Sequence, residues 1–190
     1  MFQLSHLGLI RSGIHLRGTA GTQPDGEHLI VQLGDVREGE INFDRVIRMD
    51  LDRARPKDYL APGDILLRSR GASYGAALVL ECPVGTLAAA PLYVLRLETP
   101  GVEADYVVWF INRPMTQAQL GTSAHGTHIP TVSLEAFGKL DIVLPAQSEQ
   151  RRILEMEQLF QQEKDITSKY MERRGQLVQL AQETILEKQF

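Results

Sequence analysis

The sequence predicts an α+β protein, with a β-rich globular domain followed by a long C-terminal α-helix that packs in a coiled-coil-like dimer. Two observations support this fold class. Before Pro145, short apolar runs alternate with Gly and Pro, whereas after it no Pro occurs and Gly occurs once, at Gly175. Short apolar runs between turn residues are typical of strands, and a long Pro-free segment with periodic apolar residues is typical of a helix. We therefore expect a domain at residues 1–147 and a helix at residues 148–190.

The globular part is expected to consist mainly of short strands separated by turns that contain Gly, Pro and Asp. The expected strands cover residues 29–33, 41–43, 46–47, 64–68, 76–80, 93–97 and 140–144. One helix is expected from Asp105, as its N-cap, to Asn112, with Trp109 and Phe110 facing the core. Many short strands with few helices favour a compact, barrel-like or half-barrel domain.

The C-terminal segment carries apolar side chains at steps of three and four residues, which is the spacing of one helix face. A helix of this length extends about 60 Å, and the preceding domain alone cannot cover its apolar face. We expect this face to pair with another helix, from a second copy or from another protein. Glu163, Arg173 and Arg174 interrupt the face, so a helical hairpin or a surface helix broken near Gly175 is the alternative. The residues expected on the pairing face are Ile153, Met156, Phe160, Ile166, Tyr170, Leu177 and Leu180.

The composition is that of an ordinary globular protein, and it limits the possible functions. No apolar run approaches the roughly 20 residues that a membrane-spanning helix needs. Residues 1–6 lack the basic start and the apolar stretch of a signal peptide, and the single cysteine, Cys82, excludes an internal disulfide. These features fit a cytoplasmic location. The net charge of −4 argues against a nonspecific nucleic-acid coat, which should be basic, but it allows a DNA reader with a local basic face.

The sequence lacks the catalytic motifs that would indicate an enzyme. It has no Gly-x-x-x-x-Gly-Lys-Ser/Thr phosphate loop and no Glu-x-Lys of common metal-dependent nucleases, and residues 112–115 differ from the Asn-Pro-Pro-Tyr type motif of adenine methyltransferases. His125 and His128 lie in a segment with Gly and Pro and without nearby carboxylates, which argues against a zinc site. Cys82 has no basic neighbour that would activate it, so we expect a buried structural thiol. We therefore expect no enzymatic activity and no metal or cofactor.

Two loops that contain glycine are the candidate binding sites. Residues 68–75 join two expected strands and offer guanidinium, hydroxyl and phenol groups that can contact DNA phosphates or base edges. The candidate DNA-binding residues of this loop are Arg68, Ser69, Arg70, Ser73 and Tyr74. The second loop covers residues 121–130, in which Thr127 and His128 are the candidates. For each loop, the alternative is an ordinary solvated turn.

Four segments follow one another in an order that is known from one family. Residues 33–41 contain Leu-Gly-Asp-Val and a Gly-Glu-Ile turn, and residues 60–67 contain a Gly-Asp-Ile-Leu element that precedes the loop with Arg and Ser. Residues 126–130 form a glycine-containing loop, and a strand at residues 140–145 is followed by Ser-Glu-Gln-Arg-Arg-Ile at residues 148–153. This order resembles the target-recognition domains of type I restriction-modification specificity subunits, and the last junction is the most specific match.

The resemblance implies a non-enzymatic DNA-recognition protein. Such domains read a few base pairs through loops in the DNA grooves, and their long helices pair antiparallel and set the distance between two half-sites. They also carry the modification subunits, which methylate adenine with S-adenosylmethionine. A full specificity subunit has two such domains and two helices, so this chain resembles one half, and a symmetric homodimer would read a split palindromic site in double-stranded DNA. The alternative is an adaptor or regulator of a restriction complex without sequence-specific DNA binding of its own, which the acidic net charge favours.

Overall fold

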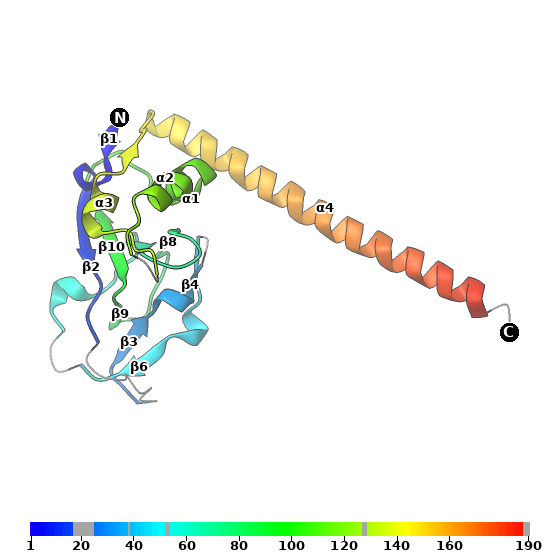
Figure 1. Cartoon of the computed structure of the whole chain (residues 1–190), viewed down its shortest axis with the longest axis horizontal. Helices are drawn as coiled ribbons and strands as arrows, with labels where there is room; N and C mark the ends of the chain where they lie inside the picture. Colours follow the sequence, from blue (N-terminus) through cyan, green and yellow to red (C-terminus); the bar gives the residue numbers. More distant parts are fainter. Residues whose placement is uncertain (17–24, 38, 52–53, 127–128, 188–190) are drawn as a thin grey trace. The chain divides into compact units, whose positions relative to one another are not determined.

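The protein has a strand-rich globular unit and a long helix (Figure 1). The computed structural model describes residues 1–16, 25–37, 39–51, 54–126 and 129–187. The chain divides into two compact units, Met1–Gln150 and Arg151–Phe190. Within the described residues, every strand lies in the first unit, and the second unit is helical. The expected α+β fold class, a β-rich domain followed by a long C-terminal helix, is confirmed.

The largest sheet of the first unit has four antiparallel strands in the order β2-β10-β7-β8. The strands are β2 (Gly8–Ser12), β10 (Leu92–Leu97), β7 (Ile65–Arg68) and β8 (Ala76–Leu78). β10 lies between β2 and β7, with Tyr93 opposite Ser12 on one side and opposite Leu67 on the other. β7 and β8 form a hairpin in which Leu67 lies opposite Ala76, so the first candidate loop connects two neighbouring strands of this sheet.

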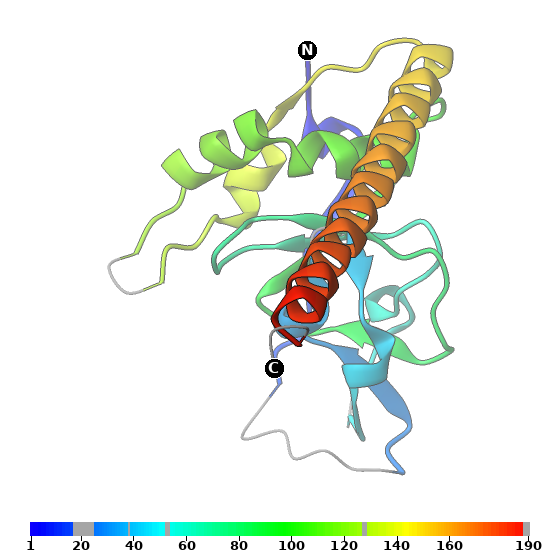
Figure 2. The ribbon, with the colours of Figure 1, turned by 90° about the vertical axis from the view of Figure 1, so that its right-hand side faces the viewer.

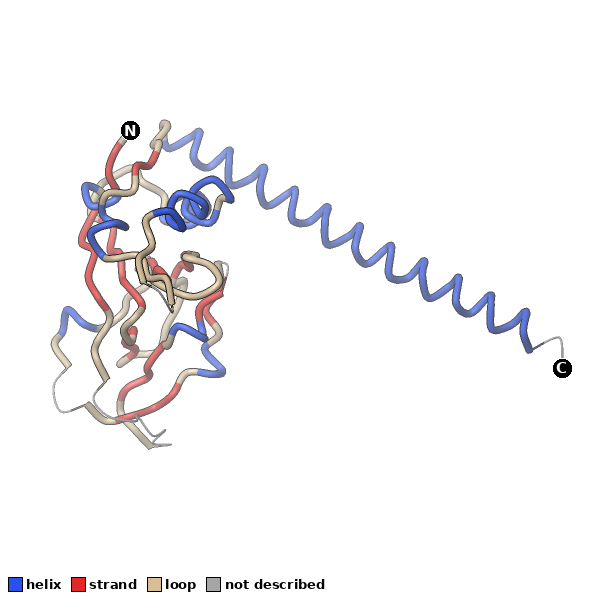
Figure 3. Tube along the Cα trace, viewed as in Figure 1, coloured by secondary structure: helices blue, strands red, loops and turns tan. Residues whose placement is uncertain are grey.

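A second sheet has three strands in the order β6-β3-β9, and two short strand pairs complete the unit (Figure 3). In the second sheet, β3 (His28–Val31) runs antiparallel to β6 (Ile47–Met49) and parallel to β9 (Thr86–Ala88). The short pairs are β1 (Phe2–Gln3) with β11 (Asp141–Ile142) and β4 (Val36–Arg37) with β5 (Glu40–Ile41). Leu66 and Val94 of the large sheet share a buried hydrophobic cluster with Val31 and Ala88 of the second sheet. Burial of these apolar side chains holds the two sheets together.

Short helices cover the rest of the globular unit. The α-helices are α1 (Ala104–Asn112), α2 (Pro114–Thr122) and α3 (Leu134–Gly138), and the 3-10 helices are η1 (Leu4–His6), η2 (Leu33–Asp35), η3 (Phe43–Arg45) and η4 (Pro56–Asp58). α1 packs against β8 and α2, and it buries Tyr106, Val107, Phe110 and Ile111. Figures 1 and 2 show α1, α2 and α3 near the N-terminus of the chain, whereas β3 and β6 lie at the opposite end of the unit.

The helix boundaries follow local capping rules, although α2 and α3 were not expected from the sequence. Pro114 occupies the first turn of α2, where its missing N–H leaves no helical hydrogen bond unmade. Ser133 caps α3, because its side chain accepts a hydrogen bond from the backbone N–H of Ala136 at 3.1 Å. The expected cap of α1 was wrong: the N-cap residue is Glu103, and Asp105 lies within the first turn. Phe110 is buried as expected, whereas Trp109 is only half-buried.

The strands formed near their expected positions, but several are shorter. Residues 76–80 form a strand only up to Leu78, and the Leu80 side chain beyond it is 71% exposed. Residues 140–144 form only the two-residue β11, because its partner β1 has two residues. Leu33 and Phe43 begin 3-10 helices instead of ending strands.

The Gly-Asp-Ile-Leu element has a structural role at the start of β7. Gly63 has a φ of +91°, a left-handed conformation that glycine adopts without strain. The Asp64 carboxylate is buried and accepts a hydrogen bond from the backbone N–H of Ala61 at 2.9 Å. It also accepts two from the guanidinium of Arg96, at 2.7 and 2.6 Å, and this hydrogen bonding raises the pKa of Arg96. The element therefore fixes the turn before β7 and pairs its buried charge within the fold.

The described residues of the second unit lie within α4, which is continuous from Gln147 to Glu187. The helix passes through Gly175 without interruption, so the alternative of a hairpin or a helix broken near that residue is wrong. Every side chain from residue 158 to residue 187 is exposed. Among the described residues, no helix combines the length and the apolar character that crossing a membrane requires.

Candidate nucleic-acid interface

The first candidate loop is a closed turn between β7 and β8. The backbone N–H of Arg68 donates to the carbonyl of Gly75 at 2.9 Å and closes the loop at its base. Gly71, in the middle, has a φ of +115°, which a residue with a side chain rarely adopts. The loop therefore has a defined start and end, and its central residues project beyond the sheet.

Arg68 is half-buried at the base of this loop. Its Nη1 donates to the carbonyl of Val36 at 3.0 Å, which ties the loop to the β4–β5 hairpin. Its Nε is buried and has no hydrogen-bond partner among the described residues. The side chain borders an open hollow of about 730 Å³, which is also lined by Gly34, Arg37, Glu40, Ala72 and Ser73. Arg37 and Arg68 carry positive charge and Glu40 carries negative charge, so the lining of this hollow is basic by one charge, in spite of the acidic net charge of the chain.

Ser69 is not available for binding. Its side chain is fully buried, and its Oγ donates to the carbonyl of Pro91 at 2.6 Å. The Ser69 carbonyl accepts a hydrogen bond from the backbone N–H of Val132 at 2.8 Å. The expectation that Ser69 contacts DNA is therefore corrected: this residue joins the first loop to the segment that precedes α3.

Arg70 brings the two candidate loops together. The residue is exposed, and its backbone pairs with Thr131 in an isolated antiparallel bridge. Thr131 also pairs with His125, through hydrogen bonds of 2.9 and 3.0 Å that close the second loop. The first loop ends at residue 75 and the second begins at residue 121, yet the two lie side by side in the fold. Thr127 and His128, the candidates of the second loop, lie outside the described residues.

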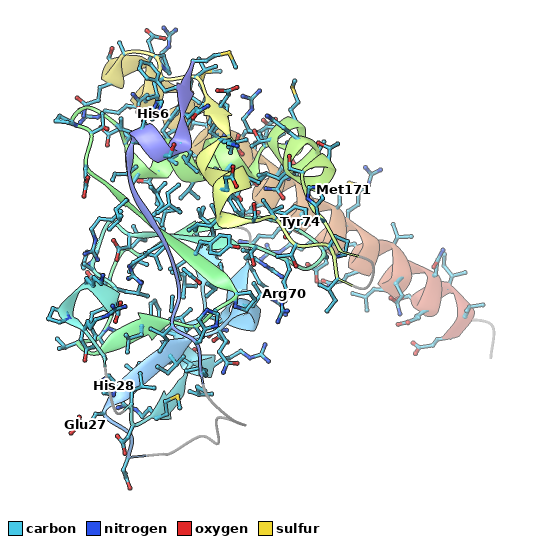
Figure 4. The ribbon with its side chains drawn as sticks, turned by 60° about the vertical axis from the view of Figure 1, so that its left-hand side comes forward. His6, Glu27, His28, Arg70, Tyr74 and Met171 are labelled. Atoms are coloured by element: carbon cyan, nitrogen blue, oxygen red, sulfur yellow. The ribbon has the colours of Figure 1, made fainter. Side chains whose placement is uncertain are left out.

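Ser73 and Tyr74 are partly exposed, and side chains of α1 and α2 hold this end of the loop. Gln117 Oε1 accepts a hydrogen bond from the backbone N–H of Tyr74 at 2.9 Å. Asn112 binds both backbone groups of Ala76: Oδ1 accepts from the N–H at 2.7 Å, and Nδ2 donates to the carbonyl at 2.9 Å. Figure 4 shows Arg70 and Tyr74 on the same side of the globular unit.

Sequence reasoning missed both Asn112 and Gln117. Asn112 lies 36 residues from Ala76, and Gln117 lies 43 residues from Tyr74. Side-chain amides on helices are common in proteins, so no local pattern marks these two as loop anchors. Only the packing of α1 against β8 reveals their role.

The guanidinium, hydroxyl and phenol groups of this surface are suited to binding. Among the described residues, no group of three or more His, Cys, Asp or Glu side chains could hold a metal ion. Cys82 is partly buried, its Sγ donates to the carbonyl of Leu60 at 3.7 Å, and burial raises the pKa of the thiol. The surface formed by the two loops and the hollow is named the loop face below, and its exposed or partly exposed polar residues include Arg37, Arg70, Ser73 and Tyr74.

Comparisons with known proteins give matches to solved structures alone. No family model and no characterised protein matches the sequence. The S subunit of the type I restriction-modification system from M. genitalium is 14% identical, with a TM-score of 0.57 over 85% of this chain and 38% of that chain. The HsdS subunit from Thermoanaerobacter tengcongensis is 18% identical, with a TM-score of 0.61 over 87% of this chain and 43% of that chain. A chain from a study of complex assembly and conformational transition in the type I R-M system is 17% identical, with a TM-score of 0.61 over 85% of this chain and 37% of that chain.

These likenesses define the class of fold. The resemblance to a type I specificity subunit, which the sequence motifs predicted, is confirmed as a shared fold. The chain spans between 37% and 43% of the length of these solved chains. Because the first unit ends at Gln150 of 190 residues, a match over 85% of the chain must extend into α4.

Proposed function

We propose that this chain is the DNA-recognition half of a type I specificity subunit, and that its loop face contacts double-stranded DNA. The observation that carries the proposal is the convergence of two separate loops beside a locally basic hollow, in a fold shared with solved S subunits. Exposed guanidinium groups bind phosphates or guanine edges, and hydroxyl and phenol groups add hydrogen bonds. Arg70, Ser73 and Tyr74 are the proposed contacts of the first loop, with Arg68 bordering the hollow. Thr127 and His128 remain the candidates of the second.

The long helix is the basis for the proposed quaternary structure. Of the seven residues expected on the pairing face of α4, six are between 54% and 69% exposed, and Ile153 is half-buried. So much exposed apolar surface on one helix favours association with another helix. We propose a homodimer through α4 that presents two loop faces to the two halves of a split palindromic site. In this assembly an adenine methyltransferase subunit performs the chemistry, the chain itself is not an enzyme, and the complex works in the cytoplasm.

The test is a selection from randomised duplex DNA, with the full chain and its methyltransferase partner. The expected result is one enriched motif in two parts, with binding that weakens steeply as the salt concentration rises. Arg70→Ala should weaken binding and reduce the salt dependence by about one phosphate contact. Arg48→Ala is the matched control, because Arg48 is exposed on β6, in the other sheet. A selection that enriches no motif would overturn the proposal.

The second candidate function is an adaptor or regulator of a restriction complex without sequence-specific DNA binding of its own. The net charge of −4 favours it, because duplex DNA repels an acidic protein outside any local basic face. The selection from randomised duplex DNA distinguishes the two candidate functions. An adaptor would join the methyltransferase complex and leave both the selected sequence and the salt dependence unchanged, whichever residue of the loop face is replaced.

A further inference from the structure

Two charged residues interrupt the apolar face of α4, at positions that an interhelical interface would bury. A heptad spacing of alternating three- and four-residue steps places one line of residues along the helix, here named the seam. Its central part consists of Phe160, Glu163, Thr167, Tyr170, Arg174 and Leu177. Glu163 and Arg174 are the two charged residues among these six. They carry opposite charges, and they lie symmetrically about the middle of the seam, between Thr167 and Tyr170.

Neither charge has an opposite partner within its own helix. Side chains three and four residues apart are the neighbours on a helix surface. For Glu163 these neighbours are Leu159, Phe160, Ile166 and Thr167, none of which is charged. For Arg174 the corresponding neighbours are Tyr170, Met171, Leu177 and Val178, again without charge. A second helix packed on the seam would remove both charges from water, so the partner must supply the opposite charge.

The direction of the partner helix decides whether it can do so. In a parallel, in-register pair of two copies, Glu163 would face Glu163 and Arg174 would face Arg174, which places like charges together in two layers. In an antiparallel pair the order of the partner is reversed. A register in which Thr167 faces Tyr170 then also brings Phe160 opposite Leu177 and Glu163 opposite Arg174. Because the pair is symmetric, each of these contacts occurs twice.

We propose that two copies of α4 pair antiparallel in this register, and that Glu163 of each copy forms an ion pair with Arg174 of the other. The inference rests on the homodimer of the proposed function and specifies its register. A shift of one heptad in one direction would place Glu163 against Thr167 and Arg174 against Met156. A shift in the other direction would place Glu163 against Ala181. Both shifts bury a charge without its counterpart, so the ion pair selects one register among those that the apolar residues allow.

Three further features of the helix agree with this register. Residue 151 of one copy lies opposite residue 186 of the other, so the overlap covers almost all of the described second unit. Residues 151–190 contain seven Lys or Arg and seven Asp or Glu, so the segment has no net charge that would drive two copies apart. The same spacing also brings Met156 opposite Ala181, which extends the apolar contact on both sides of the ion pair.

The experiment compares charge reversals in the full chain, by sedimentation equilibrium without DNA. Glu163→Arg and Arg174→Glu should each weaken the homodimer by about tenfold or more, because each creates two layers of like charge. The double variant E163R/R174E should restore a dimer within about threefold of the original Kd. An equimolar mixture of the two single variants should form a heterodimer, which also shows that both variants fold. Glu172→Arg is the matched control, because residue 172 lies on the side of the helix opposite to the seam.

The outcomes separate this inference from the proposed function. Single variants that dimerise as the original chain does, or a double variant no better than the singles, would overturn the register. An original chain that stays monomeric over the whole concentration range would overturn it as well. A parallel dimer would also form the heterodimer in the mixture, but it would show neither the loss in the single variants nor the recovery in the double variant. The DNA selection described above tests recognition separately, so recognition can stand where the register fails.

Discussion

Replacement of Asn112 with alanine should destabilise the globular unit through the backbone of one buried residue. Asn112 makes two hydrogen bonds to Ala76, of 2.7 and 2.9 Å, and Ala76 is fully buried. The substitution leaves the Ala76 N–H without a partner, and such a group costs about 1–3 kcal/mol. The Ala76 carbonyl keeps a hydrogen bond from the backbone N–H of Gly39, at 3.1 Å. Asn112 itself is half-buried, so water can replace part of the loss. We therefore expect the free energy of unfolding to fall by about 1–3 kcal/mol.

Urea unfolding of the full chain, followed by tryptophan fluorescence and circular dichroism, measures this loss. Asn112→Asp refines the test, since a carboxylate keeps the acceptor for the Ala76 N–H but faces the Ala76 carbonyl with a second acceptor. It should be destabilising as well. Gln119→Ala is the matched control, because Gln119 is an exposed amide on α2. An Asn112→Ala variant within about 0.5 kcal/mol of the original chain would refute the reasoning, because that change is typical of an uninvolved surface residue.

Three further predictions concern the helix, an ion pair and the cysteine. Gly175→Ala should stabilise α4 by about 1 kcal/mol in thermal unfolding followed at 222 nm, because an added Cβ meets nothing within 4 Å; a lower stability would show that the position is covered. The Arg55 guanidinium lowers the pKa of Asp58, so its stabilisation is present above the ordinary aspartate pKa and is lost as the pH falls through the lowered value. Asp58→Asn should accordingly be less stable than the original chain at pH 7 and equal to it at the acid end of a pH series, and a constant difference would contradict this. Cys82 should react with a maleimide much more slowly in the folded chain than in urea, because burial raises its pKa; equal rates would contradict this.

The sequence predicted the elements that depend on local pattern. The division between the strand-rich unit and the helix follows from Pro and Gly usage, which acts through each residue's own backbone. The loop between β7 and β8 follows from its glycines between two apolar runs. The long helix was expected from residue 148, and α4 begins at Gln147. In each case the information lies within a few residues of the feature.

The parts that could not be predicted depend on contacts between distant residues. Ser69 was grouped with Arg70 because both lie in a polar loop, but Ser69 is buried, since Pro91 and Val132 reach it from elsewhere in the chain. The β11 strand is shorter than its apolar run suggests, because the length of a strand pair is set by the shorter partner. The second candidate loop was recognised from its composition, but its position beside the first depends on the bridge at Thr131.

In the loop face, the contacts that hold the first loop in place differ from the side chains that the loop exposes. The Arg68 and Ser69 side chains anchor the base of the first loop. The contacts to its exposed part are made to the backbone: Gln117 binds the N–H of Tyr74, and Thr131 pairs with the backbone of Arg70. A backbone group is the same whichever side chain the residue carries, so the exposed side chains can change while the loop keeps its place. Gln117, in contrast, acts through its own side chain and cannot be exchanged freely. The position of the proposed reading residues is therefore fixed by groups other than their own side chains, and their specificity lies in those side chains. A DNA reader needs this arrangement if one frame is to carry many recognition sequences.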